Sequence, residues 1–348
     1  MKQAQPLRAL VRAVALTAAV LVTAPVLAQT APIVFASWGG TTQSAQQKEW
    51  AQPFTQSSGI QVLMDGPTDY GKLKAMVDSG NVQWDVVDVE GDFAYAALRD
   101  GLVEPIDYSV VNKSQLDPRF MSPGAVGSFY YSFVLGYNKA AFKNGSPSTY
   151  ADLFDTKRFP GKRTFYKWSA PGVLEVALLA DGVAPDKLYP LDLDRAFKKL
   201  DTIKSSIVWW EAGAQAPQLL ADGAVVMTQA YNGRIDDAVH KDKKPFKIVW
   251  DAQVYDYEWW AVVNGAKHAD AAQKFIVSAS TPQAYADLSK YIAYAPPRKD
   301  AIPLIDKARL NDLPTAPENF KRPLQINATF WADNADAINK RFQNWLTQ

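Results

Sequence analysis

Residues 250–267 read WDAQVYDYEWWAVVNGAK, and the rest of the chain is organised around this stretch. Its aromatic residues alternate with two carboxylates, Asp256 and Glu258. An alternation with period two and a high aromatic content predicts a β-strand. Carboxylates are costly to bury among aromatic rings unless a cation or a hydrogen-bond donor meets them. The strand is therefore either an edge strand with a wet polar face or the wall of a cation-binding pocket.

The first part of the chain alternates short apolar runs with helical spacing of apolar residues. The apolar runs, which predict strands, are residues 33–37, 60–64 and 84–89. Such an alternation is typical of a parallel sheet with crossover helices, where ligands bind beyond the carboxyl ends of the strands. Trp38, Asp69 and either Glu90 or Asp92 follow the three strands. We expect these side chains to converge on one crevice.

A second group of strands follows a long aromatic run at residues 128–137, which could leave one domain and enter another. The further predicted strands are residues 163–168, 208–210 and 224–229. The last of them leads into Tyr231, Asn232, Gly233 and Arg234. Arg234 therefore lies at a strand end and could point into a cleft between the two domains.

The N-terminus has the features of a secretory signal. Residues 1–28 contain three basic and no acidic residues, an apolar run at 11–22 and a small-residue cleavage site ending at Ala28. The apolar run is too short to span a membrane. The remainder of the chain, long enough for two domains, is expected to be exported to a bacterial periplasm.

Composition excludes several classes of function. The chain has no cysteine, so we expect no disulfide, no thiolate metal site and no cysteine nucleophile. After residue 28 it has 34 basic and 36 acidic residues, a balance that does not indicate nucleic-acid binding. Two histidines and no Gly-x-Ser-x-Gly motif leave little for nucleophilic catalysis. We therefore expect a binding protein rather than an enzyme, without a cofactor or a metal site.

Two other readings of the same residues stay open. Tyr130 and Tyr131 could bind a ferric ion, although they lie on an apolar strand. Glu90 and Glu258 could act as the paired carboxylates of a glycoside-processing enzyme.

Several short motifs together carry a resemblance to a known family. The motifs are Trp38-Gly39-Gly40, residues 84–87, residues 136–138, Tyr231-Asn232-Gly233, and Glu258 followed by residues 265–267. In their order and spacing they resemble the substrate-binding proteins of bacterial ABC importers, in the branch of spermidine/putrescine receptors. The resemblance spans nearly all of the chain after the signal. It implies an α/β, two-lobed periplasmic-binding-protein fold of type II, each lobe a mostly parallel sheet flanked by helices, joined by a hinge.

The resemblance also implies how the chain divides and what it contacts. The first lobe would hold residues 29–133 and 260–305, and the second lobe residues 134–259 and 306–348. A small amine would bind in the cleft between the lobes. The receptor, working as a monomer, would then dock onto the membrane permease subunits of an importer.

The site of the family carries over only in part. Trp38 matches an aromatic residue that stacks on the polyamine chain, and Glu258 matches an aspartate that grips an ammonium group. Tyr231 stands where the family usually has tryptophan. Gly40 replaces an acidic residue, and Asp256 falls where a tryptophan would be. These departures make spermidine a less suitable ligand, because a long polycation needs carboxylates at both ends.

Other departures point to a different ligand. Glu90 and Asp92 add acids where the family has hydroxyl groups. Arg234 would repel a diamine but could bind a carboxylate through both arms of its guanidinium. Arg234 with Glu258 or Glu90 would then suit a zwitterion such as 4-aminobutyrate. Alternatively, Arg234 pairs with Asp236, Asp237 or an acid of the cleft and only sets the local charge.

We therefore expect a periplasmic receptor for a putrescine-type polyamine or an amino-carboxylate such as 4-aminobutyrate. A receptor for another solute class, ferric ion or a thiamine-like compound, is the alternative. The expected ligand-binding residues are Trp38, Gly39, Glu90, Asp92, Tyr231, Arg234, Asp256 and Glu258. Trp168, Trp209 and Trp210 are either further aromatic walls of the cleft or core residues.

Overall fold

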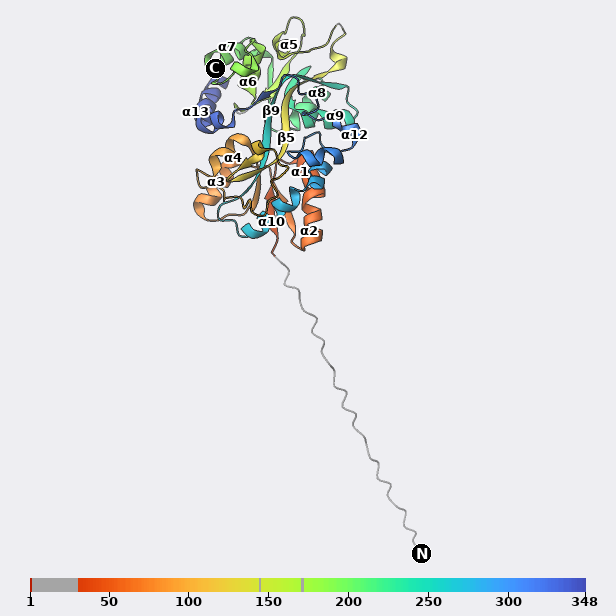
Figure 1. Ribbon diagram of the computed structural model, residues 1–348. Helices are drawn as coiled ribbons and strands as arrows, with labels where there is room; N and C mark the ends of the chain where they lie inside the picture. Colours follow the sequence, from red (N-terminus) through yellow and green to blue (C-terminus); the bar gives the residue numbers. More distant parts are fainter. Residues whose placement is uncertain (2–30, 144, 170–171) are drawn as a thin grey trace.

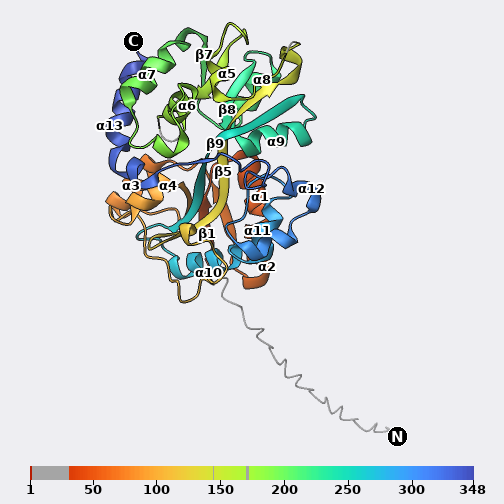
Figure 2. The ribbon, with the colours of Figure 1, turned by 45° about the horizontal axis from the view of Figure 1, so that its top comes forward.

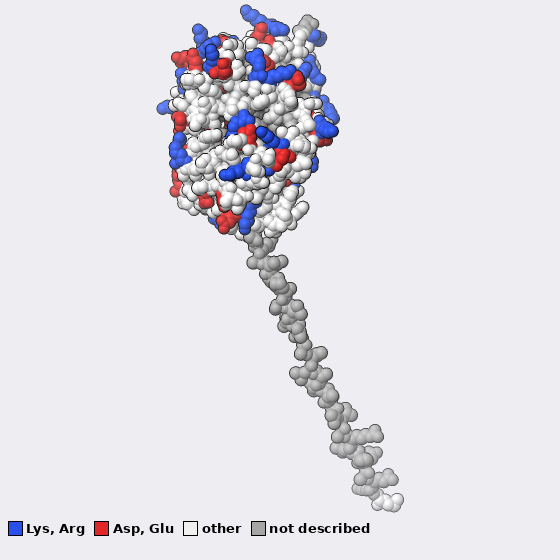
Figure 3. Space-filling view, in the orientation of Figure 1, with Lys and Arg blue, Asp and Glu red and all other residues white. Residues whose placement is uncertain are grey.

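The computed structural model describes residue 1 and residues 31–143, 145–169 and 172–348. The predicted signal peptide, residues 1–28, thus lies outside the described residues except for Met1. Within the described part, two groups of helices lie one above the other, and two long strands run through both groups (Figure 1). On the face seen in Figure 3, acidic and basic side chains are interspersed, in line with the nearly balanced charge.

The strands form one sheet with the order β2-β1-β3-β9-β5-β8-β6-β7, with β4 paired to β5 and β10 to β9. The strand bounds are β1 Ile33–Ala36, β2 Val62–Asp65, β3 Val86–Glu90, β4 Met121–Ser122, β5 Ala125–Asn138, β6 Arg163–Tyr166, β7 Ile207–Trp210, β8 Met227–Tyr231, β9 Phe246–Val262 and β10 Leu324–Gln325. The outer trios β2-β1-β3 and β8-β6-β7 are parallel, while β9 and β5 pair antiparallel with each other and with their outer neighbours. We call the part around β1, β2 and β3 the first lobe, and the part around β6, β7 and β8 the second lobe.

Helices flank the sheet in both lobes (Figures 1 and 2). Their bounds are α1 Gly40–Gln46, α2 Gln52–Ser58, α3 Tyr70–Ser79, α4 Gly91–Ala97, α5 Tyr150–Phe154, α6 Val173–Ala180, α7 Leu193–Asp201, α8 Gln215–Ala221, α9 Asn232–His240, α10 Ala269–Ala279, α11 Pro282–Leu288, α12 Lys307–Leu310 and α13 Ala328–Leu346. Local sequence explains where several of them begin. Asp69 caps α3 by accepting a hydrogen bond from the Lys72 backbone N–H at 2.7 Å, and Thr281 caps α11 just before Pro282. Among the described helices, none has the length and apolar character needed to cross a membrane.

Residues 250–262 of the stretch quoted at the outset belong to β9, a strand of 17 residues, and residues 263–267 follow it. Its prediction as a strand is confirmed, but the interpretation as an edge strand is wrong. β9 lies between β3 and β5, and its residues from Ala252 to Val262 are buried on both faces. The carboxylate face is buried because it turns toward the cleft and the packed helices rather than toward bulk solvent.

The two long strands β5 and β9 join the lobes (Figure 2). Their register is interrupted between Phe133 and Leu135, which pair with Val254 and Val249 of β9. Ala252, within the extra residues of β9, has a φ of 53°, a left-handed conformation that a non-glycine residue adopts only under local constraint. The sheet therefore bends where the lobes meet, and the cleft lies beside this bend. The predicted residue limits of the two lobes stay a prediction.

Candidate functional site

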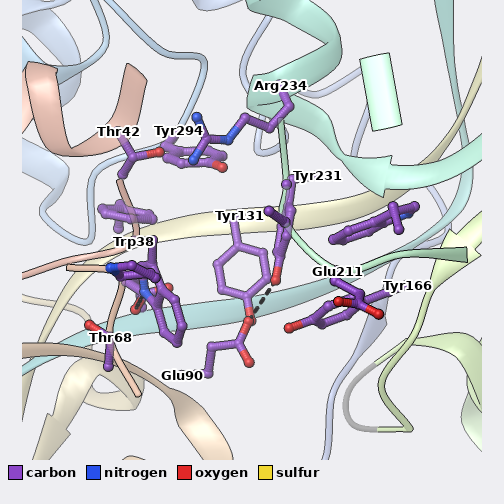
Figure 4. A pocket seen from close by; sticks show the side chains of 16 residues that line it. Trp38, Thr42, Thr68, Glu90, Tyr131, Tyr166, Glu211, Tyr231, Arg234 and Tyr294 are labelled. Atoms are coloured by element: carbon purple, nitrogen blue, oxygen red, sulfur yellow. Dashed lines mark hydrogen bonds between the residues drawn. The ribbon is translucent and has the colours of Figure 1, made fainter. Parts of the chain in front are cut away.

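A cavity of about 210 Å³ lies between the lobes (Figure 4). Its walls come from both lobes and from the crossing strands. The lining residues are Trp38, Thr42, Pro67, Thr68, Glu90, Phe129, Tyr131, Tyr166, Trp210, Glu211, Ala212, Gly213, Tyr231, Arg234, Glu258 and Tyr294. Its volume is below that of pockets that hold drug-sized molecules, so it suits a small solute.

The topology of the sheet explains why these residues meet. Glu90 is the last residue of β3, and Trp38 follows β1 by two positions. Tyr166, Trp210 and Tyr231 are the last residues of β6, β7 and β8. Parallel strands place their carboxyl ends along one edge of a sheet, and here the edges of the two lobes face each other across the cavity. The expected convergence of strand ends therefore occurs, although Asp69 caps a helix and its neighbours Pro67 and Thr68 line the cavity instead.

Two carboxyl groups form one end of the cavity. Glu90 on β3 and Glu258 on β9 are paired directly opposite each other in the antiparallel ladder. The indole Nε1 of Trp38 donates to Glu258 Oε1 at 2.7 Å. The hydroxyls of Tyr231 and Tyr131 donate to Glu90 Oε1 at 2.9 and 3.2 Å. These wall donors fix the orientation of both carboxyl groups.

Burial raises the pKa of both carboxyl groups, Glu90 and Glu258. Desolvation raises the pKa of Glu90 to about 8, with a further contribution from the charge of Asp92, against the hydrogen bonds from the two tyrosines. Desolvation also raises the pKa of Glu258 well above its usual range, and the neighbouring Asp88 and Glu90 add to it. Two like charges directly opposite each other in a ladder are destabilising. This end of the cavity therefore holds either protons or a bound cation.

Arg234 lies at the other end of the cavity, away from Glu90 and near Tyr294 (Figure 4). It belongs to the first turn of α9, is 9% exposed, and donates from Nη2 to the backbone oxygen of Gly39 at 3.2 Å. The guanidinium thus reaches from the second lobe to the first. Its side chain combines positive charge with N–H donors that can bind a carboxylate in bidentate fashion.

The alternative partners of Arg234 are engaged elsewhere. Asp236 forms an ion pair with Arg309 at 2.6 Å, and its Oδ1 lies 2.9 Å from His240 Nδ1. Asp237 accepts a hydrogen bond from the Thr41 hydroxyl at 2.8 Å. Within the described residues, no carboxylate forms an ion pair with Arg234.

Three of the expected ligand-binding residues do not line the cavity. Gly39 contributes only its carbonyl, through the contact with Arg234. Asp92 lies in the first turn of α4, where it accepts a hydrogen bond from the Phe93 backbone N–H at 2.7 Å. Asp256 is 1% exposed and its oxygens lie beside Gly91, because it is two residues along β9 from Glu258 and faces the start of α4. The structure brings together Trp38, Glu90, Tyr231, Arg234 and Glu258.

Sequence reasoning missed several aromatic residues of the wall. Tyr166 stacks on Trp210 with ring centroids 4.3 Å apart, and Phe129 stacks on Tyr294 at 4.6 Å. Tyr166 was missed because the strand was predicted to run to residue 168, whereas β6 ends at Tyr166. Tyr294 could not be predicted, because it lies in a connecting segment without a recognisable motif.

The sequence left open whether Trp168, Trp209 and Trp210 are walls of the cleft or core residues, and the structure places them in three different environments. Trp210 lines the cavity, while Trp209, its neighbour on the opposite face of β7, packs edge-on against Trp345 of α13. Trp168 is 43% exposed and is not part of the cavity lining.

Tyr130 and Tyr131 cannot share a ferric ion. Tyr131 donates to Glu90 in the cavity, whereas the Tyr130 hydroxyl donates to Asp117 at 2.9 Å. Adjacent residues of a strand point to opposite faces of the sheet, so the two hydroxyls diverge.

A model of the family described as bacterial extracellular solute-binding protein matches residues 49–318. The chain belongs to this family. The resemblance to receptors of ABC importers, and the two-lobed α/β fold that it implies, are confirmed.

Relatives of this solute-binding protein include characterised receptors. A γ-aminobutyric acid-binding protein of Pseudomonas aeruginosa is 40% identical over 328 residues, covering 92% of each chain. The solved Atu4243-GABA receptor is 50% identical, with a TM-score of 0.84, over 90% of this chain and 97% of that one. AgtB of Agrobacterium tumefaciens R10, solved with agropinic acid, is 37% identical with a TM-score of 0.85, over 92% and 99% of the chains.

A more distant neighbour is similar in fold alone. The putative spermidine/putrescine ABC transporter protein of Listeria monocytogenes has a TM-score of 0.74 at 19% identity. It covers 90% of this chain.

Proposed function

We propose that this solute-binding protein is a periplasmic receptor for 4-aminobutyrate or a close amino-carboxylate, which it delivers as a monomer to the permease of an ABC importer. The observation that carries this proposal is the arrangement of charge in the cavity. Glu90 lies at one end and Arg234 at the other, with the rings of Tyr131 and Tyr231 between them (Figure 4). Glu258 is the cross-strand partner of Glu90. A ligand with an ammonium and a carboxylate at its two ends complements this arrangement.

The ammonium group would sit at the acidic end. Within the described residues, the hydrogen bonds to Glu90 and Glu258 end on Oε1 of each group, which leaves both Oε2 atoms for a ligand. An alkyl ammonium has three N–H donors and can satisfy both oxygens at once. Its methylene groups would lie against Trp38 and Tyr231, and a cation–π contact of the ammonium group with either ring would contribute about 1–2 kcal/mol when desolvated.

The relatives support the amino-carboxylate over a diamine. Two of them, at 40% and 50% identity, are described as receptors for γ-aminobutyric acid. A diamine would place its second ammonium near the buried guanidinium of Arg234, and this repulsion is the physical reason for assigning a zwitterion.

We propose that this site binds its ligand and does not catalyse a reaction on it. Glycosidases place two carboxyl groups about 5–9.5 Å apart on either side of the bond that they cleave. Glu90 and Glu258 instead lie side by side on one wall, as direct cross-strand neighbours. This geometry holds one cationic group between the two acids and does not flank a scissile bond.

The test of the proposed function is a calorimetric titration of the purified protein after bound ligand has been removed. The panel contains 4-aminobutyrate, putrescine, butyrate and 4-(trimethylammonio)butyrate. We expect tight binding of 4-aminobutyrate alone, because butyrate lacks the cation and the trimethylammonio compound lacks N–H donors. A thermal shift should accompany it, since a ligand at a hundred times its Kd adds about 2.7 kcal/mol to stability. Stronger binding of putrescine than of 4-aminobutyrate would overturn the assignment.

Binding should release protons. Without ligand, the raised pKa of Glu90, about 8, keeps this group largely protonated at pH 6, and an ammonium ion at its side favours the ionised form. The affinity for 4-aminobutyrate should therefore rise from pH 6 to pH 8, by up to about tenfold per pH unit for each proton released. Calorimetry at pH 6.5 in two buffers of different ionisation enthalpy measures this release directly. Equal apparent enthalpies in the two buffers would contradict the prediction.

A further inference from the structure

The guanidinium of Arg234 occupies space that exists only because residue 40 has no side chain. Gly40 begins α1 in the first lobe, while Arg234 comes from α9 in the second. A Cβ atom on Gly40 would lie 2.7 Å from Arg234 Nη1 and 3.5 Å from Cζ. The neighbouring Gly39 carbonyl accepts the hydrogen bond from Nη2. The first lobe thus provides both a gap and an acceptor for a side chain of the second lobe.

The second lobe is also open around this side chain. Gly213, in the loop after β7, lies so close that a Cβ there would be 3.3 Å from Arg234 Nε and 3.4 Å from the Tyr231 ring. Glycine backbone therefore lies next to Arg234 at two points, Gly213 beside Nε and Gly40 beside Nη1. Only the Gly40 contact is too short for a Cβ to fit without movement of the guanidinium.

The Arg234 side chain also borders a second space, into which it can move. It lines a separate hollow of about 220 Å³, which shares no other lining residue with the ligand cavity. Asp237, Asp242 and Lys244 line that hollow as well, so it offers two carboxylates to a displaced guanidinium against one ammonium group. Arg234 accordingly forms the wall between two spaces, and its contacts with Gly39 and Gly40 hold it on the side of the ligand.

We propose that Gly40 is a specificity-determining position, which places Arg234 for the ligand carboxylate when the lobes close. The gap and the acceptor belong to the opposite lobe, so the carboxylate end of the site is complete only in the closed arrangement. Gly40 acts through Arg234 and is a positioning residue. This inference rests on the proposed function, because it gives the carboxylate group a defined partner.

The experiment compares Gly40→Ala with Gly80→Ala in the full receptor. Gly40 and Gly80 have φ values of 59° and 69°, so alanine is strained at both, but nothing lies within 4 Å of a Cβ at Gly80. Calorimetry should show that Gly40→Ala binds 4-aminobutyrate at least about tenfold more weakly, which is the effect of losing one charge-assisted hydrogen bond. Gly80→Ala should stay within about threefold of the unaltered protein. Equal losses in the two variants would assign the effect to backbone strain and overturn the proposal.

A double-mutant cycle shows whether Gly40 acts through Arg234. In the Arg234→Ala background, Gly40→Ala should cause little further loss of 4-aminobutyrate affinity, because the displaced group is already absent. Additive losses would mean that Gly40 acts on the ligand by another route.

Crystal structures of Gly40→Ala and of the unaltered protein, both with the lobes closed, separate this inference from the proposed function. In the variant, the guanidinium should move into the hollow beside Asp237 and Asp242 and lose its contact with the Gly39 oxygen. If it stays on Gly39, the positioning role fails even where 4-aminobutyrate binds. If it moves while the unaltered protein does not bind 4-aminobutyrate, the positioning role stands and the ligand assignment fails.

Discussion

Arg234→Ala is expected to weaken 4-aminobutyrate binding by roughly a hundredfold to a few thousandfold. The buried guanidinium is the cationic group of the cavity wall, and without it the ligand carboxylate is desolvated with no counter-charge. Removing one partner of a buried ion pair costs about 3–5 kcal/mol, which corresponds to this range of affinity. Calorimetric titration of the variant measures the loss.

Two comparisons make the Arg234 result specific. The affinity of Arg234→Lys for 4-aminobutyrate should lie between those of the unaltered protein and Arg234→Ala, because lysine keeps the charge but not the planar fork of donors. Putrescine affinity should hold or improve in Arg234→Ala, since the variant removes a repulsive charge. Unchanged 4-aminobutyrate affinity would take Arg234 out of the site and return the ligand class to the amines.

Glu258→Gln is expected to weaken 4-aminobutyrate binding by about ten- to a hundredfold, the range of a hydrogen bond to a charged group. The ligand-free protein should melt at the same temperature or higher. Because the pKa of Glu258 is raised well above its usual range, the folded ligand-free protein already favours the neutral form. The amide keeps an oxygen for the Trp38 indole. Titration and a melting curve on the same sample measure both effects.

Asp256→Asn is the matched control for Glu258→Gln. It makes the same acid-to-amide change two residues away on the same face of β9, but outside the cavity lining. We expect a much smaller loss of affinity than in Glu258→Gln. If the Asp256 variant lost as much, the carboxylates would act as a diffuse negative field and Glu258 would have no special contact.

Much of the first lobe could be predicted from the sequence because its signals are local. The strands β1, β2 and β3 appear as apolar runs, and the cap at Asp69 depends only on residues within one helical turn. Because ligands bind beyond the carboxyl ends of parallel strands, Trp38 and Glu90 could then be predicted to lie at one cleft. Each of these inferences uses contacts between residues close in sequence or the fixed geometry of parallel sheets.

The parts that could not be predicted depend on contacts between distant segments. The alternation in β9 left open whether its polar face is wet or forms the wall of a pocket, and only its pairing with both β3 and β5 shows that the face is buried. Asp256 and Glu258 look equivalent by sequence, yet Glu258 faces the cavity and Asp256 faces Gly91. Tyr294 reaches the wall through a loop, and no local pattern indicates that.

The resemblance to polyamine receptors identified the fold, while the departures from it pointed to the ligand. The glycine at position 40, which departs from the family, and Arg234 meet in the structure, where a Cβ added to Gly40 would lie 2.7 Å from Arg234 Nη1. Neither residue alone shows that they depend on each other. Their proximity is a tertiary contact between two lobes, and one sequence without structure does not contain it.

The place of β9 in the sheet also sets an order of events during folding. β3 and β5 each pair with β9 along one edge, and β9 ends at Val262 in a chain of 348 residues. Until β9 takes its place, the partial sheets that contain β3 and β5 both carry an unpaired edge, which invites wrong pairing with other chains. A folding chain therefore stays vulnerable to aggregation until β9 pairs, and it then gains the partner strand for both edges from a single segment.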